Sequence, residues 1–289
     1  MNRIALGTAQ FGMPYGIANK EGKIELNEAK RILDVCKLKQ IDTLDTAMAY
    51  GDSEKSLGFL GVDKYKVVTK LPLVPINCSD IDKWIREQVT HSFSQLNVNR
   101  VYALLLHHPQ SLLEKNGPEI YLTLKKLQEE NLINKIGVSI YSPSYLSAIL
   151  NSYSIDIIQA PFNLIDQRLL RSGWLAKLRS LGIEIHIRSI FLQGLLLLEE
   201  NKIPKYFSKW HPLWKNWFSW LRDSNLSPID ACTSFALSFP EIDRLIIGVD
   251  NSSQLRQIFN GVSNEAIKQW PNIESNDEAL INPSNWPKL

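Results

Sequence analysis

Side chains able to transfer protons stand at the ends of three consecutive apolar segments. Asp45 and Tyr50 follow the first of these segments, and Lys70 ends the next. His107 follows the third. A phenol, with a pKa of about 10, is a weak acid at neutral pH, but a nearby ammonium group stabilises its phenolate and strengthens it. We therefore expect Lys70, held by Asp45, to tune Tyr50 as a proton donor to a developing alkoxide, while His107 hydrogen-bonds the substrate oxygen.

These residues must be positioned by a regular framework, and the sequence indicates one. Short β-branched segments alternate with segments of helical period, such as 27–38, 82–96, 119–131 and 227–239. Strands alternating with helices imply right-handed crossovers and a parallel sheet. The pattern favours one domain, residues 1–289, folded as a closed (β/α)8 TIM barrel of the α/β class. The predicted strands are 3–7, 43–45, 66–69, 101–106, 135–138, 155–159, 184–188 and 244–247.

An open doubly wound sheet is the alternative fold. It is less favoured because Gly7, Gly12 and Gly16 follow the first strand with the wrong spacing for a G-x-G-x-x-G turn. No linker or change of composition divides the chain into further domains.

Further polar residues end the later predicted strands. Ser139 follows the fifth strand, Gln159 the sixth and Arg188 the seventh. Active sites of (β/α)8 barrels lie at the carboxyl ends of the strands, so we expect these side chains to converge. Strand alternation should turn one of the adjacent His107 and His108 into the barrel and the other toward a helix, which argues against a metal pair.

The composition excludes several classes of protein. The net charge is only +2 and no cluster of Lys or Arg is present, so we expect no nucleic-acid partner. The 3 cysteines are widely spaced and form neither a disulfide framework nor a zinc motif. No apolar run resembles a signal peptide or could cross a bilayer. We expect a cytoplasmic protein without metal or membrane contact, a monomer or weak homo-oligomer, acting on a small molecule.

Motifs along nearly the whole chain resemble those of the aldo-keto reductase family. LDTAMAYGDSEKSLG is similar to its D-T-A-x-x-Y-G-x-S-E signature, VVTKL to its strand with the catalytic lysine, and LLLHHP to its L-x-H-x-P strand. KIGVS and IIGVDNSSQL are similar to its R-x-I-G-V-S segment and I-x-G cofactor loop. The resemblance implies a (β/α)8 barrel that moves a hydride between a nicotinamide cofactor and a carbonyl or alcohol without a metal. The catalytic residues that it implies are Asp45, Tyr50, Lys70 and His107.

The resemblance also implies how the nicotinamide is held. Ser139 and Gln159 fall on family residues that bind its amide, although Ile140 stands where an Asn usually follows the serine. Arg188 falls on a tyrosine that commonly stacks on the nicotinamide, and a flat guanidinium could stack in the same way.

NADPH is the expected cofactor, with NADH as the alternative. We expect weak discrimination, because no cation stands at the positions aligned with the partners of the 2′-phosphate and Asp250 adds a negative charge. Backbone N–H groups at 251–253 should still bind the phosphate, and Arg256 lies nearby. The cofactor residues expected in this loop and helix are Gly248, Asn251, Ser252 and Gln254.

The sequence leaves alternatives for the substrate and for the class of function. ALGTAQFGMPYGIAN resembles a branch found among surface-polysaccharide and sugar-biosynthesis genes, which implies a sugar or sugar-derived carbonyl. Segments 190–226 and 262–289 should wall the substrate pocket, and the aromatic run in KWHPLWKNWFSWL should pack at helical spacing. One alternative is a nicotinamide-binding redox sensor or regulatory subunit with vestigial turnover. Another is a lyase or isomerase that uses Lys70 as a Schiff base.

Overall fold

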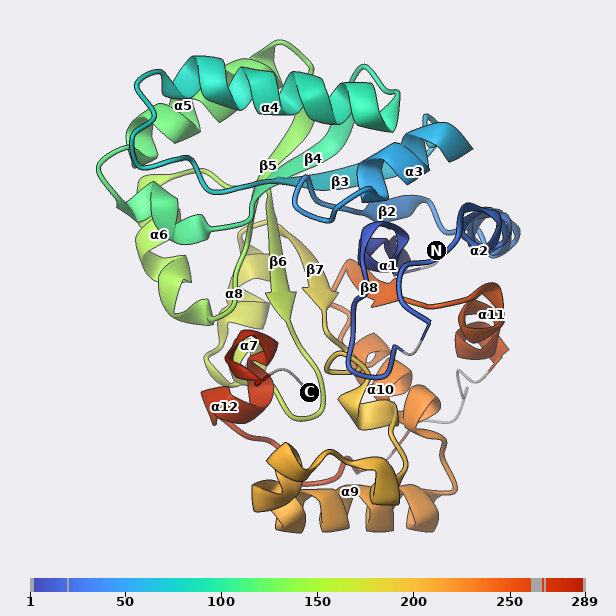
Figure 1. Ribbon diagram of the computed structural model, residues 1–289. Helices are drawn as coiled ribbons and strands as arrows, with labels where there is room; N and C mark the ends of the chain where they lie inside the picture. Colours follow the sequence, from blue (N-terminus) through green and yellow to red (C-terminus); the bar gives the residue numbers. More distant parts are fainter. Residues whose placement is uncertain (1–2, 20, 261–266, 268, 288–289) are drawn as a thin grey trace.

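The strands of the protein close into a parallel barrel, as the sequence predicted. The computed structural model describes residues 3–19, 21–260, 267 and 269–287, and Figure 1 colours the chain from end to end. Each strand pairs in parallel with the next in sequence, and β8 pairs with β1. The strands are β1 (Ile4–Gly7), β2 (Thr43–Asp45), β3 (Lys66–Leu71), β4 (Val101–Leu106), β5 (Ile133–Ser139), β6 (Ile157–Pro161), β7 (Glu184–Arg188) and β8 (Arg244–Gly248).

Pairing between neighbours decides where several strands begin and end. β3 extends to Leu71, beyond the predicted end, because Leu71 pairs with Leu106 of β4. β5 begins earlier than predicted, since Ile133 pairs with Val101. β6 begins at Ile157, opposite Gly137 of β5. These shifts do not move the polar residues away from the carboxyl ends.

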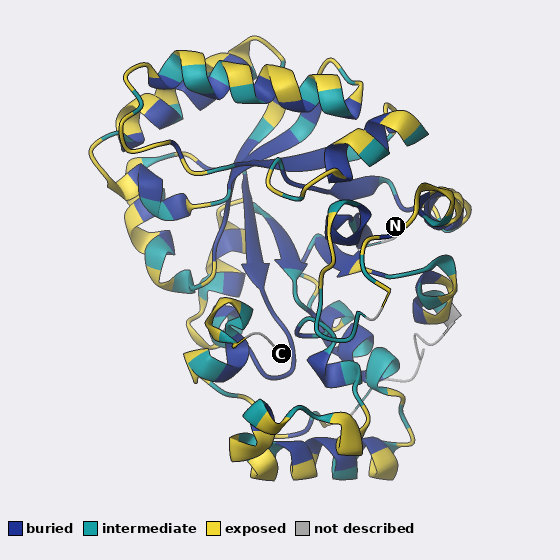
Figure 2. Cartoon of the chain, viewed as in Figure 1, coloured by how far each residue is buried: buried dark blue, intermediate teal, exposed yellow. Residues whose placement is uncertain are grey.

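Helices surround the barrel with their apolar faces inward, as the dark blue strands and yellow outer helix faces of Figure 2 show. The four helices predicted from the sequence are present, with ends shifted by a few residues. The α-helices are α1 (Ala9–Gly12), α2 (Leu26–Leu38), α3 (Ser53–Leu60), α4 (Ile81–Leu96), α5 (Gly117–Glu129), α6 (Leu146–Ser152), α7 (Arg168–Arg171), α8 (Trp174–Ser180), α9 (His211–Ser224), α10 (Pro228–Leu237), α11 (Ser252–Asn260) and α12 (Glu278–Ile281).

Polar side chains occupy the barrel near the amino ends of the strands. Tyr102 donates its hydroxyl to Glu184 Oε2 over 2.7 Å, and His186 Nε2 lies 2.7 Å from Glu184 Oε1. Lys135 pairs with the same carboxylate. Three side chains therefore share the Glu184 carboxylate, and this end is a packed floor.

The aromatic run after β7 packs instead of lining the site. Trp214 and Trp217 are buried within α9, which lies at the lower edge of the view in Figure 1. Trp214 Nε1 donates to Phe207 O over 2.9 Å. The predicted packing role is therefore confirmed. Within the described part of the chain, no helix has the length and apolar character needed to cross a bilayer.

Candidate active site

Lys70 and Asp45 form a buried ion pair at the ends of neighbouring strands. Asp45 pairs with Val68 in the ladder of β2 and β3, so Lys70, two residues further on, projects from the same face. Lys70 Nζ lies 2.7 Å from Asp45 Oδ2 and donates a second hydrogen bond to Thr46 O over 2.8 Å. The exposed fraction of Lys70 is 0%. An ammonium group removed from water needs such partners, and Asp45 and Thr46 O hold that of Lys70 in one place.

Tyr50 and His107 complete the group at the same end of the barrel. Lys70 Nζ lies 4.9 Å from the centroid of the Tyr50 ring. The Tyr50 and His107 ring centroids are 5.9 Å apart, with the planes at 80°. The structure therefore brings together all four residues that the sequence singled out for proton transfer.

The pKa of Tyr50 shifts against the expectation from the sequence. Burial raises this pKa well above its ordinary value, Asp45 raises it further, and Arg188 opposes the shift. The net shift of the Tyr50 pKa is upward, because burial and Asp45 outweigh the opposing charge of Arg188. Burial also lowers the pKa of Lys70, while the Asp45 carboxylate opposes that shift. At neutral pH Tyr50 is a protonated phenol.

His107 and His108 differ in exposure and environment. His107 is half-buried and His108 is exposed, with their ring centroids 5.7 Å apart. His107 lies beside Tyr50, as assigned, but strand alternation is not the reason, because β4 ends at Leu106, before either residue. Burial lowers the pKa of His107 to about 3, and the charge of Lys70 adds to the shift. His107 is thus a neutral imidazole at physiological pH.

Close backbone packing fixes the loop that carries Tyr50. At Gly12, the last residue of α1, a Cβ would lie 1.7 Å from Tyr50 O, so no other residue fits there. Ser53 donates its hydroxyl to Thr8 O over 2.8 Å, and Thr8 N donates to Asp45 O over 2.9 Å. The loops after β1 and β2 are therefore held as one unit.

Glu54, the last residue of the Y-G-x-S-E signature, is a buried anchor for α3. Thr69 and Ser92 donate their hydroxyls to Glu54 Oε1 over 2.6 Å and 2.7 Å. Burial raises the pKa of Glu54, and these hydrogen bonds oppose the shift. Because Thr69 precedes Lys70 in β3, this contact also fixes the strand end that carries the lysine.

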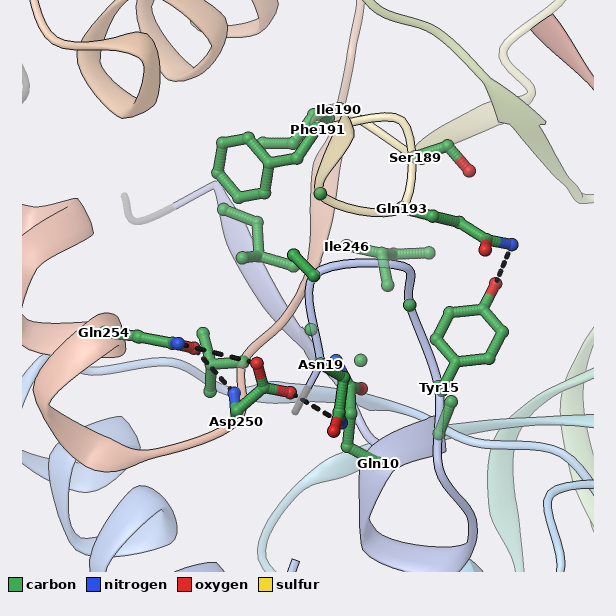
Figure 3. A pocket seen from close by; sticks show the side chains of 18 of the residues that line it. Gln10, Tyr15, Asn19, Ser189, Ile190, Phe191, Gln193, Ile246, Asp250 and Gln254 are labelled. Atoms are coloured by element: carbon green, nitrogen blue, oxygen red, sulfur yellow. Dashed lines mark hydrogen bonds between the residues drawn. The ribbon is translucent and has the colours of Figure 1, made fainter. Parts of the chain in front are cut away.

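A cavity of about 320 Å³ opens beside this group. It extends from Asp45 and Tyr50, past the ends of β1 and β8, to Asp250 and Gln254 near the start of α11. Figure 3 shows its wall, with Tyr15 and Gln193 on one side and Asp250 and Gln254 on another. The cavity therefore connects Asp45 and Tyr50 to the loop after β8.

The loops after β1 and β7 meet beside the cavity, in a contact that we call the clasp. Ile17 N donates to Gln193 O over 3.1 Å, and Gln193 Nε2 donates to the Tyr15 hydroxyl over 3.4 Å. Gly194 has a φ of +89°, and a Cβ there would lie 2.6 Å from Ala18 Cβ. The clasp, formed by these five residues, depends on a glycine at position 194.

Ser139 and Gln159 are buried and connected to the ion pair. Ser139 Oγ donates to Gln159 Oε1 over 3.2 Å, and Gln159 Nε2 donates to Asp45 Oδ1 over 2.6 Å. Neither residue is part of the cavity wall. They reach the site through Asp45.

Arg188 is a cation in the cavity wall, next to the proton-transfer group. Its guanidinium lies 4.5 Å from the centroid of the Tyr141 ring and donates to Ile140 O over 3.1 Å. Ile140 and Tyr141 follow β5, so the side chain turns across β6 and away from β8. Among the described residues that line the cavity, Arg188 is the only Lys or Arg.

The expected residues of the cofactor loop divide into two groups. Gly248 and Gln254 line the cavity, whereas Asn251 and Ser252 do not. Asn251 Oδ1 accepts from Gln254 N over 2.9 Å. Ser252 N donates to Glu28 Oε1 of α2 over 2.6 Å. The expectation that the N–H of Ser252 is available to a phosphate is wrong, because a carboxylate of the same chain accepts it.

Several wall residues were not assigned to the site from the sequence. Most of them come from the loops after β1 and β7, whereas Gln257 lies in α11. The stretch TAQFGMPYGIAN, which resembles a branch of the family, is the sequence signal for the first of these loops. The 190–226 segment walls the cavity through its first residues only, and no described residue of 262–289 does so. The unassigned residues include Gln10, Tyr15, Asn19, Phe191, Gln193 and Gln257.

In the described ranges, no three His, Cys, Asp or Glu side chains are grouped so that they could hold a metal ion. The groups in or near the cavity wall are two acids, two imidazoles, phenols and two cations.

A closed parallel barrel with polar groups at the carboxyl ends of its strands defines a class of barrel enzymes. The model of the aldo/keto reductase family matches residues 3–275. Because this match spans nearly the whole chain, the protein belongs to that family.

Individual relatives are distant. The oxidoreductase sirO of Leptosphaeria maculans is 28% identical over 218 residues, which is 72% of this chain and 65% of sirO, so the chain spans just under two thirds of that relative. The holo form of aldo-keto reductase AKR11C1 from Bacillus halodurans has a TM-score of 0.72 at 18% identity, covering 92% of this chain and 88% of that one. Glycerol dehydrogenase AKR11B4 from Gluconobacter oxydans has a TM-score of 0.70 at 21% identity with the same coverage. These two structures share the fold.

Proposed function

We propose that this protein is a nicotinamide-dependent reductase that converts an aldehyde or ketone, of a sugar or sugar-derived compound, to an alcohol. Family membership supports the reaction class. The observation that carries the proposal is the group around one ion pair: Lys70 lies 2.7 Å from Asp45 and 4.9 Å from the ring of Tyr50. The Gluconobacter oxydans neighbour is a dehydrogenase of glycerol, a small polyol, which supports testing sugar-like carbonyls.

Each residue has a distinct part in the proposed reaction. A bound nicotinamide cofactor supplies the hydride. The Tyr50 phenol, kept protonated by burial, donates a proton to the carbonyl oxygen as negative charge develops there. Lys70, fixed by Asp45, stabilises the phenolate that remains. His107, neutral because its pKa is about 3, donates a hydrogen bond that orients the carbonyl.

The residues around the cavity fit a nicotinamide cofactor. Gln159 and Ser139 lie behind the wall and support Asp45, and Arg188 offers a flat cation in the wall. The clasp would enclose the middle of an elongated ligand, and Gly248 and Gln254 would contact its far end. The cavity thus offers polar contacts at both ends.

The test is multiple turnover with a panel of simple aldehydes, glyceraldehyde and open-chain sugars, following oxidation of NADH and NADPH. We expect more than one turnover per protein, and loss of reduction in Tyr50→Phe with cofactor affinity within a few fold of the unsubstituted protein. Tight binding of both cofactors without turnover on any carbonyl would favour the sensor instead. Full activity of Tyr50→Phe would show that Tyr50 is not the proton donor.

A Schiff-base lyase or isomerase is disfavoured by the surroundings of Lys70. Its Nζ is fully buried and donates to both Asp45 and Thr46 O. An attacking amine must be unprotonated and accessible. Reduction with borohydride should therefore not attach a carbonyl substrate to this protein.

A further inference from the structure

The far end of the cavity, at the start of α11, is acidic. Asp250 lies in its wall, and its Oδ1 accepts from Asn19 Nδ2 over 3.0 Å. Gln254 and Gln10 also hydrogen-bond this carboxylate. Figure 3 shows Asn19 and Gln254 directed at Asp250. Three amides therefore hold a carboxylate in the wall while leaving part of its acceptor capacity unused.

The carboxylate of Glu28 occupies the position at the N-terminus of α11 where that helix could bind an anion. Ser252 N, at the start of α11, donates to Glu28 Oε1 over 2.6 Å. Gln254 N is also satisfied, by Asn251 Oδ1. A helix N-terminus attracts phosphate through such N–H groups. Here two of them already have partners, and one partner is negatively charged.

Among the described residues that line the cavity, no cation lies beside Asp250. Arg188 is the only Lys or Arg among those wall residues, and it turns toward the end of β5. Arg256 of α11 is exposed and outside the wall. Arg31 pairs with Glu28, but its side chain is 63% exposed, so solvent screens its charge. A dianionic phosphate at this end would meet negative charge.

From these charges we propose that Asp250 and Glu28 select the nicotinamide cofactor that lacks a 2′-phosphate, so that the protein prefers NADH over NADPH. The inference rests on the proposed function, which sets the nicotinamide beside Tyr50 and the adenosine ribose at the other end of the cavity. Asp250 accepts hydrogen bonds from the ribose hydroxyls of NADH, as acidic residues do in other dinucleotide sites. The 2′-phosphate of NADPH replaces one hydroxyl by a dianion beside Asp250 and Glu28.

The first experiment measures dissociation constants by fluorescence titration at one ionic strength. We expect NADH to bind at least about tenfold more tightly than NADPH, a difference of about 1.4 kcal/mol. The fragments 5′-AMP and 2′,5′-ADP, used as competitors, should show the same order, which would locate the discrimination at the adenosine end. Equal or tighter binding of NADPH would overturn the proposal, and loss of that binding in Arg256→Ala would identify the phosphate partner.

Two isosteric variants test Asp250 and Glu28. The expected result is tighter binding of NADPH, which a misfolded protein could not show. Asp250→Asn and Glu28→Gln should each tighten NADPH binding, and the double variant should narrow the NADH preference about tenfold. Asp63→Asn removes one charge at an exposed position away from the cavity and should leave the ratio unchanged. An unchanged ratio in the double variant would overturn the assignment. If neither cofactor binds, the proposed function itself is contradicted. If both bind and NADPH binds more tightly, only this inference is contradicted.

Discussion

Gln159 Nε2 donates to Asp45 Oδ1 over 2.6 Å, so the carboxylate of Asp45 is shared between an amide of β6 and the ammonium group of Lys70. The two residues are 114 positions apart in the sequence. The shared carboxylate couples the expected nicotinamide contact to the expected proton-transfer group. A change at Asp45 should therefore affect folding, cofactor binding and turnover together.

The first prediction concerns the stability supplied by this ion pair. Asp45→Asn should lower the free energy of unfolding by about 3 to 5 kcal/mol, because it leaves the Lys70 charge buried without its partner. Adding Lys70→Met to this variant should restore much of the lost stability, since no charge is then buried. It should not restore activity. Chemical denaturation of the unsubstituted protein and the two variants measures this.

An exposed ion pair of similar length serves as the control. Lys23 Nζ lies 2.9 Å from Asp52 Oδ2, with 43% and 61% of the side chains exposed. Asp52→Asn should change stability by less than about 1 kcal/mol. The prediction fails if Asp45→Asn and Asp52→Asn have equal effects.

The second prediction separates the adjacent histidines by activity. His107→Gln should lower kcat/KM by about 100-fold, the effect of losing one donor to a developing oxyanion. His108→Gln should change it by no more than a few fold, because His108 is exposed. Steady-state kinetics with one aldehyde measures both. A larger effect at His108 would reverse the assignment.

The third prediction uses the lowered pKa of His107. In the folded protein this imidazole stays neutral down to about pH 3, whereas the unfolded chain binds a proton near its ordinary value of 6.5. Unfolding therefore takes up a proton between these values, and stability falls as the pH drops below 6.5. By pH 4.5 this group should account for a loss of about 2 to 3 kcal/mol.

The variant His107→Gln has no such proton to bind. Its stability should fall less than that of the unsubstituted protein between pH 7.5 and 4.5, when both are measured by denaturant titration. Parallel pH curves for the two proteins would show that His107 is not the group responsible.

The fourth prediction tests the clasp. Gly194→Ala brings a methyl group to within 2.6 Å of Ala18 Cβ, so the loops after β1 and β7 must separate. We expect faster cofactor dissociation in stopped-flow measurements, by about tenfold if contacts worth about 1.4 kcal/mol are lost. Gly182→Ala is the matched control, because Gly182 has a φ of +70° and a Cβ placed there would meet nothing within 4 Å.

Both substitutions place a side chain in left-handed backbone and should cost about 1 to 2 kcal/mol of stability. Only Gly194→Ala should change the dissociation rate. The same rate in both variants would mean that the clasp does not retain the cofactor.

The sequence determined the barrel and which four residues meet beside the Lys70–Asp45 ion pair. Alternating strand and helix periods are local properties, so they are readable without the fold, and so is the spacing of Asp45 and Tyr50 in one motif. Lys70 and His107 could be added because parallel strands bring their carboxyl ends to one side.

Tertiary structure decided the charges and the pairing across the site. The pKa of Tyr50 depends on how completely the closed barrel removes water from it, which no residue pattern records. Ser252 meets Glu28 although they are 224 positions apart, because β8 pairs with β1 and brings α11 beside α2. That closure gives a partner to an N–H group that the sequence alone left free for a phosphate, and it places a second carboxylate, Glu28, beside the loop that carries Asp250.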